Sequence, residues 1–409
     1  MKTKKLAIIG YGGRGRIYGR FALCYPEKFQ LVAAADIKEN RLEPLKEQGV
    51  KTYLDYKEML DAGFDLDLVA ITTQDAQHRE HALYAMAKGY DLLLEKPIAT
   101  TKEECLEIFE FAKAHGRKVY VCHVLRYSPF YRAVKDIIDA GTLGDIVNLQ
   151  ALEGVGYYHM AHSYVRGPWR NTAQSSPMIL AKCCHDMDII RYLIGEKCIS
   201  VNSNGSRKFF RKENAPEGAT QYCSQCPHKN TCTWNAQKLY TTDDYRWTAE
   251  YFLKDNDKSD ENILRELKGS QYDKCVFLND NDVVDHQSTT ILFENGVTAV
   301  HTMTGFTQKV YRDLKIFGTK AELYGHMEDS YIEIRPFGGE VQKIHVDISE
   351  ATLGGHSGSD YFMMEQLYNE LNGVESKGIT YLDVSIESHL MSFAAEESRL
   401  SGGETKKLL

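Results

Sequence analysis

Hydrophobic and polar positions change period repeatedly over the first 125 residues. Short apolar runs predict strands at 6–9, 30–35, 66–72, 91–94 and 118–122, with a further short one at 50–53. Stretches with helical spacing lie between them, including 79–88 and 102–115. The run over 66–72 is almost continuously apolar, which is typical of a parallel strand buried on both faces. The alternation predicts an α/β fold with a doubly wound parallel sheet over residues 1–125.

A different pattern begins after residue 125. Residues 288–303 alternate as two strands around Asn295-Gly296, which predicts a hairpin with a type I′ turn. Further strands are expected at 146–155, 310–317 and 321–325, with helices at 130–140, 176–194, 365–371 and 386–400. Residues 126–409 are therefore predicted to form a second α/β domain with a mostly antiparallel sheet. Residues 203–285 are polar and predict an insertion at the edge of that sheet.

Composition excludes several function classes. The chain has 409 residues, 43% hydrophobic content and a net charge of −8, so two folded domains and no nucleic-acid partner are expected. No apolar run approaches the ~18 residues that a membrane span needs. The apolar segment after the N-terminal lysines is too short for a secretory signal, and a cytoplasmic protein is expected.

A glycine-rich segment follows the first predicted strand. In Gly-Tyr-Gly-Gly-Arg-Gly, Gly10 permits a tight turn, Gly12 lets the backbone approach a pyrophosphate and Gly15 allows close packing of strand and helix. The following helix N-terminus would supply free N–H groups to the phosphates, so Gly13 and Arg14 join the predicted dinucleotide site. A glycine turn with only a structural role is the alternative.

An acidic residue ends the second predicted strand. Asp36 lies about 20 residues after the last glycine of the motif, where a dinucleotide site places a carboxylate against the ribose 2′-hydroxyl. This favours NAD as the cofactor. Lys38 and Arg41 lie close by in the sequence, so NADP remains possible.

Polar residues follow three later strands of the predicted sheet. Ligands of such sheets bind beyond the carboxyl ends of the strands. The ammonium of Lys96 could donate there to a substrate oxygen during hydride transfer, while a solvated Glu-Lys pair is the alternative. The cofactor-binding candidates at these ends are Thr72, Thr73, His78, Glu95 and Lys96, and the substrate-binding candidates are His123 and Arg126.

The order of these motifs resembles the Gfo/Idh/MocA oxidoreductases, the group around glucose–fructose oxidoreductase and inositol dehydrogenase. The motifs are G-Y-G-G-R-G, Asp36, T-T-Q-D-A-Q-H, L-L-L-E-K-P-I-A and H-V-L-R-Y-S-P. The resemblance implies an NAD(P)-binding Rossmann domain, then an α/β domain with a large, mostly antiparallel sheet that often forms the oligomer contact. A homo-oligomer and a small sugar or cyclitol substrate are therefore expected. It also implies that Lys96 lies beside nicotinamide and substrate.

The family's second signature, D-x-G-x-H-x-x-D, is only partly present. His185 and Asp188 match it, but Ala181 and Cys183 replace the first Asp and the Gly, and Lys182 stands between them. A second ammonium beside Lys96 would depress the pKa of both by repulsion. We therefore predict that His185 and Lys182 share the proton transfer while Lys96 positions the hydroxyl, and that Asp188 is structural.

A polar and aromatic segment, 157–170, predicts a substrate-binding loop. Aromatic rings with hydrogen-bond donors suit sugar recognition, although a simply packed loop is the alternative. A glycine-rich segment at 354–360 precedes a helix, for which Asp360 is a candidate N-cap. The substrate-binding candidates in these two segments are His159, Arg166, Trp169 and His356.

Three cysteines cluster within the polar insertion. Cys223, Cys226 and Cys232, with His228 between them, have ligand chemistry suited to a structural zinc ion. Free thiols or a disulfide are the alternatives. No catalytic metal is predicted.

These features together predict an NAD(P)-dependent oxidoreductase that acts on a secondary alcohol of a sugar, cyclitol or glycoside. One alternative is NAD-dependent glycoside cleavage, in which transient oxidation acidifies the neighbouring C–H so that the aglycone leaves by elimination. Another is a dinucleotide-sensing protein without turnover, which the missing Asp at position 181 would suit.

Overall fold

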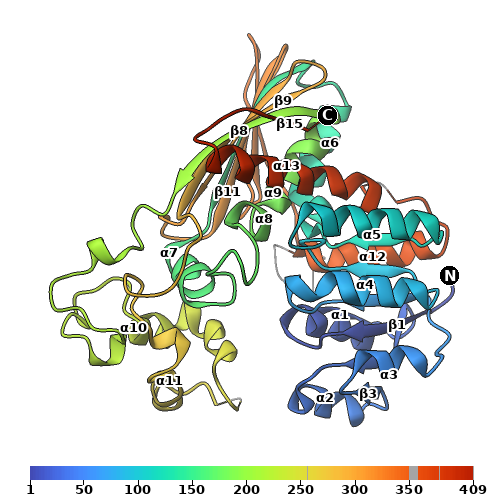
Figure 1. Ribbon diagram of the computed structural model, residues 1–409. Helices are drawn as coiled ribbons and strands as arrows, with labels where there is room; N and C mark the ends of the chain where they lie inside the picture. The colour runs from blue at the N-terminus through green and yellow to red at the C-terminus, as the bar shows by residue number, and fades with distance from the viewer. Residues whose placement is uncertain (256, 350–357, 377, 409) are drawn as a thin grey trace.

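Two sheets organise the computed structural model, which describes residues 1–255, 257–349, 358–376 and 378–408. Figure 1 shows a helix-covered sheet built from the N-terminal part of the chain beside a larger sheet built from later residues. Within the described ranges, no helix is both long and apolar enough to cross a lipid bilayer.

The N-terminal sheet has six parallel strands in the order β3-β2-β1-β4-β5-β6. The strands are β1 (Lys4–Ile9), β2 (Phe29–Ala35), β3 (Lys51–Tyr53), β4 (Leu68–Ile71), β5 (Leu92–Leu94) and β6 (Val119–Val121). The helices are α1 (Gly13–Cys24), α2 (Glu39–Lys46), α3 (Tyr56–Asp61), α4 (His78–Ala87) and α5 (Lys102–Ala114). The predicted doubly wound sheet is confirmed, and its strand order reverses between β1 and β4, where such folds bind ligands.

The second sheet has nine strands in the order β14-β13-β12-β11-β7-β10-β9-β8-β15. They are β7 (Ile146–Gly154), β8 (Cys198–Ser206), β9 (His286–Phe293), β10 (Thr298–Thr304), β11 (Tyr311–Gly318), β12 (Ala321–His326), β13 (Tyr331–Pro336), β14 (Gln342–His345) and β15 (Lys406–Lys407). Strands β7 and β10 are parallel, whereas the other neighbours are antiparallel. The predicted mostly antiparallel sheet is confirmed.

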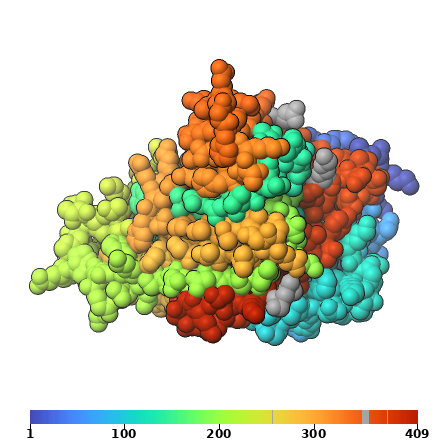
Figure 2. All heavy atoms as spheres, turned by 90° about the horizontal axis from the view of Figure 1, so that it is seen from above, coloured from blue at the N-terminus to red at the C-terminus, as the bar shows by residue number. Residues whose placement is uncertain are grey.

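Helices cover one face of the large sheet. They are α6 (Pro129–Asp139), α8 (Met178–Ala181), α9 (Cys184–Ile194) and α13 (Leu382–Leu400). Along β9, buried and exposed side chains alternate strictly, because one face lies on the core and the other does not. Figure 2 looks down on the molecule and shows the orange strands of this sheet at the surface.

The β9–β10 turn differs from the prediction. A type I′ turn needs positive φ at both central residues, but Gly296 has a φ of 83° while Asn295 is not in the left-handed region. The N–H of Gly296 donates to the carbonyl of Phe293, and Phe293 in turn donates to Val297. Glu294 and Asn295 therefore occupy the turn and Gly296 forms a bulge after it.

The last part of the chain returns to the N-terminal sheet. Helix α12 (Ser359–Leu371) buries Met363, Met364 and Leu367 in the same core as α1 and β1. Just beyond it, the carbonyl of Thr380 accepts from the N–H of Val121 in β6. The boundary predicted at residue 125 assigned this helix to the second domain, but its buried side chains complete the first, because long-range packing leaves no local sign in the sequence.

The polar insertion lies between β8 and β9, beginning after Ser206 rather than at residue 203. It contains α10 (Ala236–Thr241), η6 (Asp243–Tyr251) and α11 (Asp260–Leu267) around a small apolar core of its own. In Figure 1 it lies at the lower left, apart from the large sheet.

Candidate functional site

The glycine turn after β1 leaves room at the N-terminus of α1. A Cβ on Gly15 would lie 2.3 Å from the carbonyl oxygen of Gly10, which itself has a φ of 88°. A Cβ on Gly13 would meet nothing within 4 Å, and one on Gly12 would meet only the Arg41 side chain. The backbone is thus packed tightly on one side and open on the other, as a pyrophosphate requires.

Asp36 ends β2 beside this turn. Its carboxylate is 6% exposed and accepts from the backbone N–H of Lys38 at 2.8 Å and from Arg41 Nη1 at 3.1 Å. These contacts fix the carboxylate directly after β2, the position at which dinucleotide sites of this fold carry a ribose-binding acid. Arg41 lies within reach of the same place, so both predicted features of the ribose site come together.

Arg14 and Glu95 bind each other. Arg14 Nε lies 2.6 Å from Glu95 Oε1, and Arg14 Nη2 lies 2.6 Å from the carboxylate of Asp360 in α12. The Tyr18 hydroxyl also donates to Glu95. Burial opposes ionisation of Glu95, but the guanidinium lowers the pKa of this carboxyl below its usual range. These two candidates therefore tie the end of β5 to α1 and α12.

The residues after β4 brace the neighbouring turns. The Thr72 hydroxyl donates to the carbonyl of Gly10 at 2.5 Å, and the Thr73 hydroxyl lies 3.0 Å from His81 Nδ1. His78 is fully buried, with its ring nitrogens 2.7 Å from the carbonyl of Pro97 and 3.2 Å from that of Thr73. His78 thus connects the β4 and β5 ends instead of facing a ligand.

Lys96 turns inward from the end of β5. Its ammonium donates to the carbonyl of Ala181 at 2.9 Å, at the end of α8 and just before α9. A cis peptide joins Lys96 to Pro97, and the N–H of Ile98 donates to His389 Nε2 at 2.9 Å. His389 of α13 therefore holds the main chain next to Lys96, and the Lys96 amine lies against the segment that carries His185.

Two histidines meet beside Lys96. The rings of His123 and His185 are 5.8 Å apart and nearly perpendicular. Burial lowers the pKa of His123 far below its usual value, and the charges of Arg126 and Lys96 lower it further. His123 is therefore neutral. His185 is 5% exposed and stands at the start of α9.

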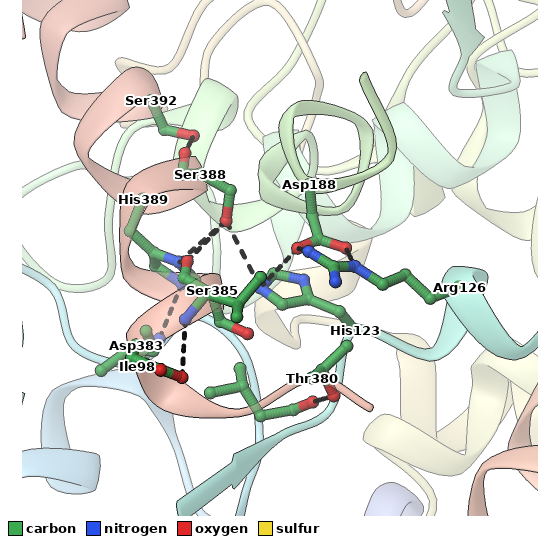
Figure 3. Close-up of polar contacts among 12 residues, drawn as sticks. Ile98, His123, Arg126, Asp188, Thr380, Asp383, Ser385, Ser388, His389 and Ser392 are labelled. Carbon is green, nitrogen blue, oxygen red and sulfur yellow. Dashed lines mark hydrogen bonds and ion pairs between the residues drawn. The ribbon is translucent and has the colours of Figure 1, made fainter. Parts of the chain in front are cut away.

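Arg126 is engaged by a carboxylate. It makes two 2.6 Å hydrogen bonds with Asp188, and both side chains are buried. Although burial disfavours its charge, Asp188 raises the pKa of Arg126 above its usual value. Figure 3 shows this pair beside His123, with Ser388 of α13 lying between His123 and His389. Arg126 and Asp188 thus hold η2 (Val124–Tyr127), the turn after β6, to α9.

Lys182 turns toward the large sheet. Its Nζ lies 3.2 Å from Oε1 of Glu153 in β7, a fully buried carboxylate that also pairs with Arg312. Burial raises the pKa of Glu153, and the two cations oppose that shift. Lys182 therefore has a carboxylate as its charged partner instead of the Lys96 ammonium that the sequence reasoning placed beside it.

The predicted substrate loop divides into two parts. Trp169 Nε1 donates to Asp75 after β4 at 3.0 Å, and the His159 ring lies 5.7 Å from that of Tyr164. Arg166, at the end of η3 (Met160–Arg166), is fully buried against the polar insertion and lies away from a ligand surface. His356 lies outside the described residues.

Comparison with known proteins identifies both parts of the chain. Residues 4–123 match the family model described as "Oxidoreductase family, NAD-binding Rossmann fold", and residues 131–248 match "GFO/IDH/MocA C-terminal domain". The chain belongs to the Gfo/Idh/MocA oxidoreductase family. Its N-terminal domain is therefore an NAD-binding Rossmann domain, and the open glycine turn and Asp36 fit that cofactor.

Two curated relatives illustrate the range of this Gfo/Idh/MocA similarity. The chain is 24% identical to the protein YteT of Bacillus subtilis over 74% of this chain and 72% of the relative. It is 30% identical to an inositol 2-dehydrogenase of Pseudomonas savastanoi over 50% of this chain and 58% of that protein. The similarity thus spans little more than half of the inositol dehydrogenase.

Solved structures share the fold over almost the whole chain. A myo-inositol 2-dehydrogenase from Lactobacillus plantarum aligns with a TM-score of 0.67 at 19% identity, covering 100% of both chains. An oxidoreductase from Agrobacterium radiobacter, solved with NAD+, L-tartaric acid and magnesium, aligns with a TM-score of 0.71 at 15% identity, covering 99% of this chain and 98% of that one. At these identities the comparison establishes the fold alone.

Several roles of residues at this Gfo/Idh/MocA site escaped the sequence reasoning. His389 holds Ile98, and Asp75 anchors Trp169. The sequence predicts Asp360 as an N-cap, but the N-cap position of α12 is Gly358, and Asp360 lies inside the helix, where it forms an ion pair with Arg14. Asp75 follows a predicted strand end and could have been found by that rule. His389 and Asp360 lie hundreds of residues from their partners, so no local signal marks them.

Proposed function

We propose that this chain is an NAD-dependent dehydrogenase that acts on a secondary alcohol of a sugar, cyclitol or glycoside. The observation that carries the proposal is the position of Lys96. It stands at the carboxyl end of β5, on the edge of the sheet that also carries the glycine turn and Asp36, and its ammonium points to the start of the segment with His185. An ammonium and an imidazole at this edge suit the handling of a hydroxyl proton.

The reaction divides between these two side chains. NAD, when bound, supplies the hydride acceptor. Lys96 donates a hydrogen bond to the carbinol oxygen and stabilises negative charge that develops there. His185 accepts the hydroxyl proton, so that the alcohol loses a proton and a hydride and becomes a ketone. Two groups position His185: the ring of His123 packs near its ring, and the Arg126–Asp188 pair fixes helix α9, which carries it.

Asp36 supports NAD over NADP. A carboxylate at this position after β2 would repel a 2′-phosphate, while Arg41, which pairs with Asp36, is the group that an NADP site would use. Trp169 and His159 are the proposed substrate contacts. The inositol dehydrogenases among the relatives make cyclitols the first substrates to test.

The decisive experiment is a substrate panel. The purified protein is incubated with NAD and, in turn, inositols, aldoses and aryl glycosides, and NADH is followed by its absorbance while aglycone release is followed separately. NADH formation with a cyclitol or sugar supports the dehydrogenase. Aglycone release without net NADH would favour glycoside cleavage, and NAD binding without turnover of any compound would favour a sensing role.

We also propose that the protein forms a homo-oligomer through the large sheet. The face of this sheet opposite α6, α9 and α13 carries the outward-facing side chains of β9, β10 and β11, where no helix of the described chain covers it. A broad sheet face without a covering layer is a surface that a second copy can bury.

A further inference from the structure

A fourth cysteine joins the three that cluster in the sequence of the insertion. Cys275 lies more than forty residues after Cys232, but an isolated antiparallel bridge pairs Tyr222 with Lys274. The N–H of Cys275 donates to the carbonyl of Gln221 at 2.9 Å. This pairing brings the last cysteine beside Cys223.

The four thiols face one space. A small cavity of about 20 Å³ is lined by Cys223, Cys226, Cys232 and Cys275, together with His228, Asn235 and apolar side chains. Such a volume holds one water-sized or ion-sized guest. His228 Nε2 lies 2.7 Å from the carbonyl of Glu217 and donates to it, which leaves Nδ1 as the acceptor of this ring. The four cysteines by themselves supply the four ligands that a tetrahedral site needs.

A buried cation points at the same cluster. Arg166 is fully buried, and its Nη2 donates to Cys223 Sγ at 3.5 Å and to the carbonyl of Trp234 at 2.7 Å. Its Nε donates to the carbonyl of Lys274, and its Nη1 has no hydrogen-bond partner among the described residues. No carboxylate of the described chain forms an ion pair with it. A buried charge without an ionic partner is unfavourable, so an anionic group beside Arg166 would stabilise it.

Metal-bound thiolates would supply that negative charge. Four thiolates around Zn²⁺, or around an iron–sulfur cluster, carry a net negative charge, and a guanidinium beside one sulfur would stabilise it. Among the described residues, no three of these sulfurs all lie within 4.8 Å of one another. The four sulfurs would therefore have to move closer together to bind Zn²⁺. An iron–sulfur cluster is wider, so binding it would need less movement.

We propose that the insertion binds a tetrathiolate metal centre, Zn²⁺ or an iron–sulfur cluster, with Arg166 as its buried counter-cation, through the four ligands Cys223, Cys226, Cys232 and Cys275. The centre joins the two ends of the insertion. Because Arg166 belongs to η3, it also fixes the segment that carries His159 to the insertion. Its role is structural, and the proposal does not depend on the identity of the substrate.

Metal content tests the proposal directly. The full chain is purified without oxygen or chelators, and its zinc, iron and acid-labile sulfide are measured together with the visible absorption spectrum. The expected result is about one zinc per chain without visible colour, or about four irons with matching sulfide and a broad band in the visible region. If neither metal is present, and neither is retained after incubation with Zn²⁺ or with iron and sulfide, the proposal is wrong.

Variants test the ligand set. Cys275→Ser is expected to lose most of the metal, whereas Cys198→Ser, at a buried cysteine of β8 outside the cluster, keeps it. Arg166→Gln is expected to release metal to a chelator at least several-fold faster. Full retention by the Cys275 variant would overturn the four-cysteine site.

A second measurement uses the unaltered protein, in case the cysteine variants do not fold. Thiol-reactive dye should modify about four more cysteines after the metal has been withdrawn by a chelator than before. An equal number of reactive thiols before and after chelation, or two disulfides in the freshly purified protein, would contradict the proposal.

Discussion

At the scale of single residues, Lys96 is the side chain on which the proposed chemistry depends. Its position follows from the strand that precedes it, from Pro97 after it, and from the carbonyl of Ala181 that holds its amine. Two other cationic candidates, Arg14 and Lys182, are each paired with a carboxylate. Lys96 instead donates to a backbone carbonyl, so its ammonium remains able to donate to a substrate oxygen.

Replacement of Lys96 tests this assignment. Lys96→Met is expected to lower kcat by about 10²- to 10⁴-fold, because the substrate oxygen loses its positioned donor. NAD binding, measured by calorimetry, should change little, since the glycine turn and Asp36 are intact. Turnover within a few-fold of the unaltered protein would remove Lys96 from the mechanism.

Lys182 provides the matched comparison. Lys182→Met should leave kcat within a few-fold but lower the free energy of unfolding by about 1–3 kcal/mol, because buried Glu153 then keeps only Arg312 as a cation. Steady-state kinetics and urea denaturation check the two parts. A loss of turnover as large as that of the Lys96 variant, with unchanged stability, would restore Lys182 to the proton transfer.

Cofactor choice rests on one carboxylate. Asp36→Ser is expected to raise kcat/KM with NADP relative to NAD by about 10- to 100-fold, because repulsion of the 2′-phosphate is removed while Arg41 remains. The ratio is measured with both cofactors and one substrate. An unchanged ratio would show that Asp36 does not face the ribose.

At the scale of elements, the site is held by helices from the far end of the chain. Helix α13 supplies His389 to Ile98 and Ser388 to His123, and α12 supplies Asp360 to Arg14. Helix α1 and the segments after β5 and β6 are thereby fixed by two helices that follow β14 in the chain. Burial lowers the pKa of His389 to about 3, so this imidazole is neutral and accepts from the Ile98 N–H.

This histidine predicts acid sensitivity. The unfolded chain takes up a proton near the ordinary histidine pKa of 6.5, whereas the folded protein resists until about 3. Stability is therefore lost as the pH falls below 6.5, by about 2 kcal/mol for this group between pH 7 and pH 5. His389→Gln should be less stable at pH 7 but decline less steeply, as urea denaturation at both pH values would show. An equally steep decline would contradict the assignment.

At the scale of the whole molecule, the two faces of the large sheet have different surroundings. Its helix-covered face meets the Rossmann domain through α9 and α13, while the opposite face is exposed (Figures 1 and 2). The polar insertion emerges between β8 and β9, and Arg16 of α1 forms an exposed ion pair with Glu250 of η6, 3.3 Å apart. The insertion thus reaches the Rossmann domain near the glycine turn.

The exposed sheet face gives the prediction at this scale. The protein is expected to be at least a dimer by light scattering, and Val300→Asp, at an outward position of β10 opposite Gln150, should shift it toward monomer because a buried carboxylate would be unpaired. Thr319→Asp, at the turn between β11 and β12, is the control. A monomeric unaltered protein would contradict the proposal.

The sequence by itself determined the parallel sheet, its alternating helices and the glycine turn, because each depends on the order of residues within a short segment. It also placed Asp36 and Lys96 directly after predicted strands, at the edge where sheets of this kind bind ligands, and His185 was recognised from the family signature. None of the three needed knowledge of distant partners, since a strand end and a short motif are local features.

Only the tertiary structure decided which candidate residues are held by other side chains of the protein and which stay available to a ligand. Arg126, Arg166 and Lys182 look alike in sequence as exposed cations, but each is held by a partner far along the chain. The return of α12 and α13 and the approach of Cys275 to Cys223 are equally invisible locally. Charge pairing and packing depend on which segments come into contact in the folded protein, and the distance between two segments along the chain does not predict that contact.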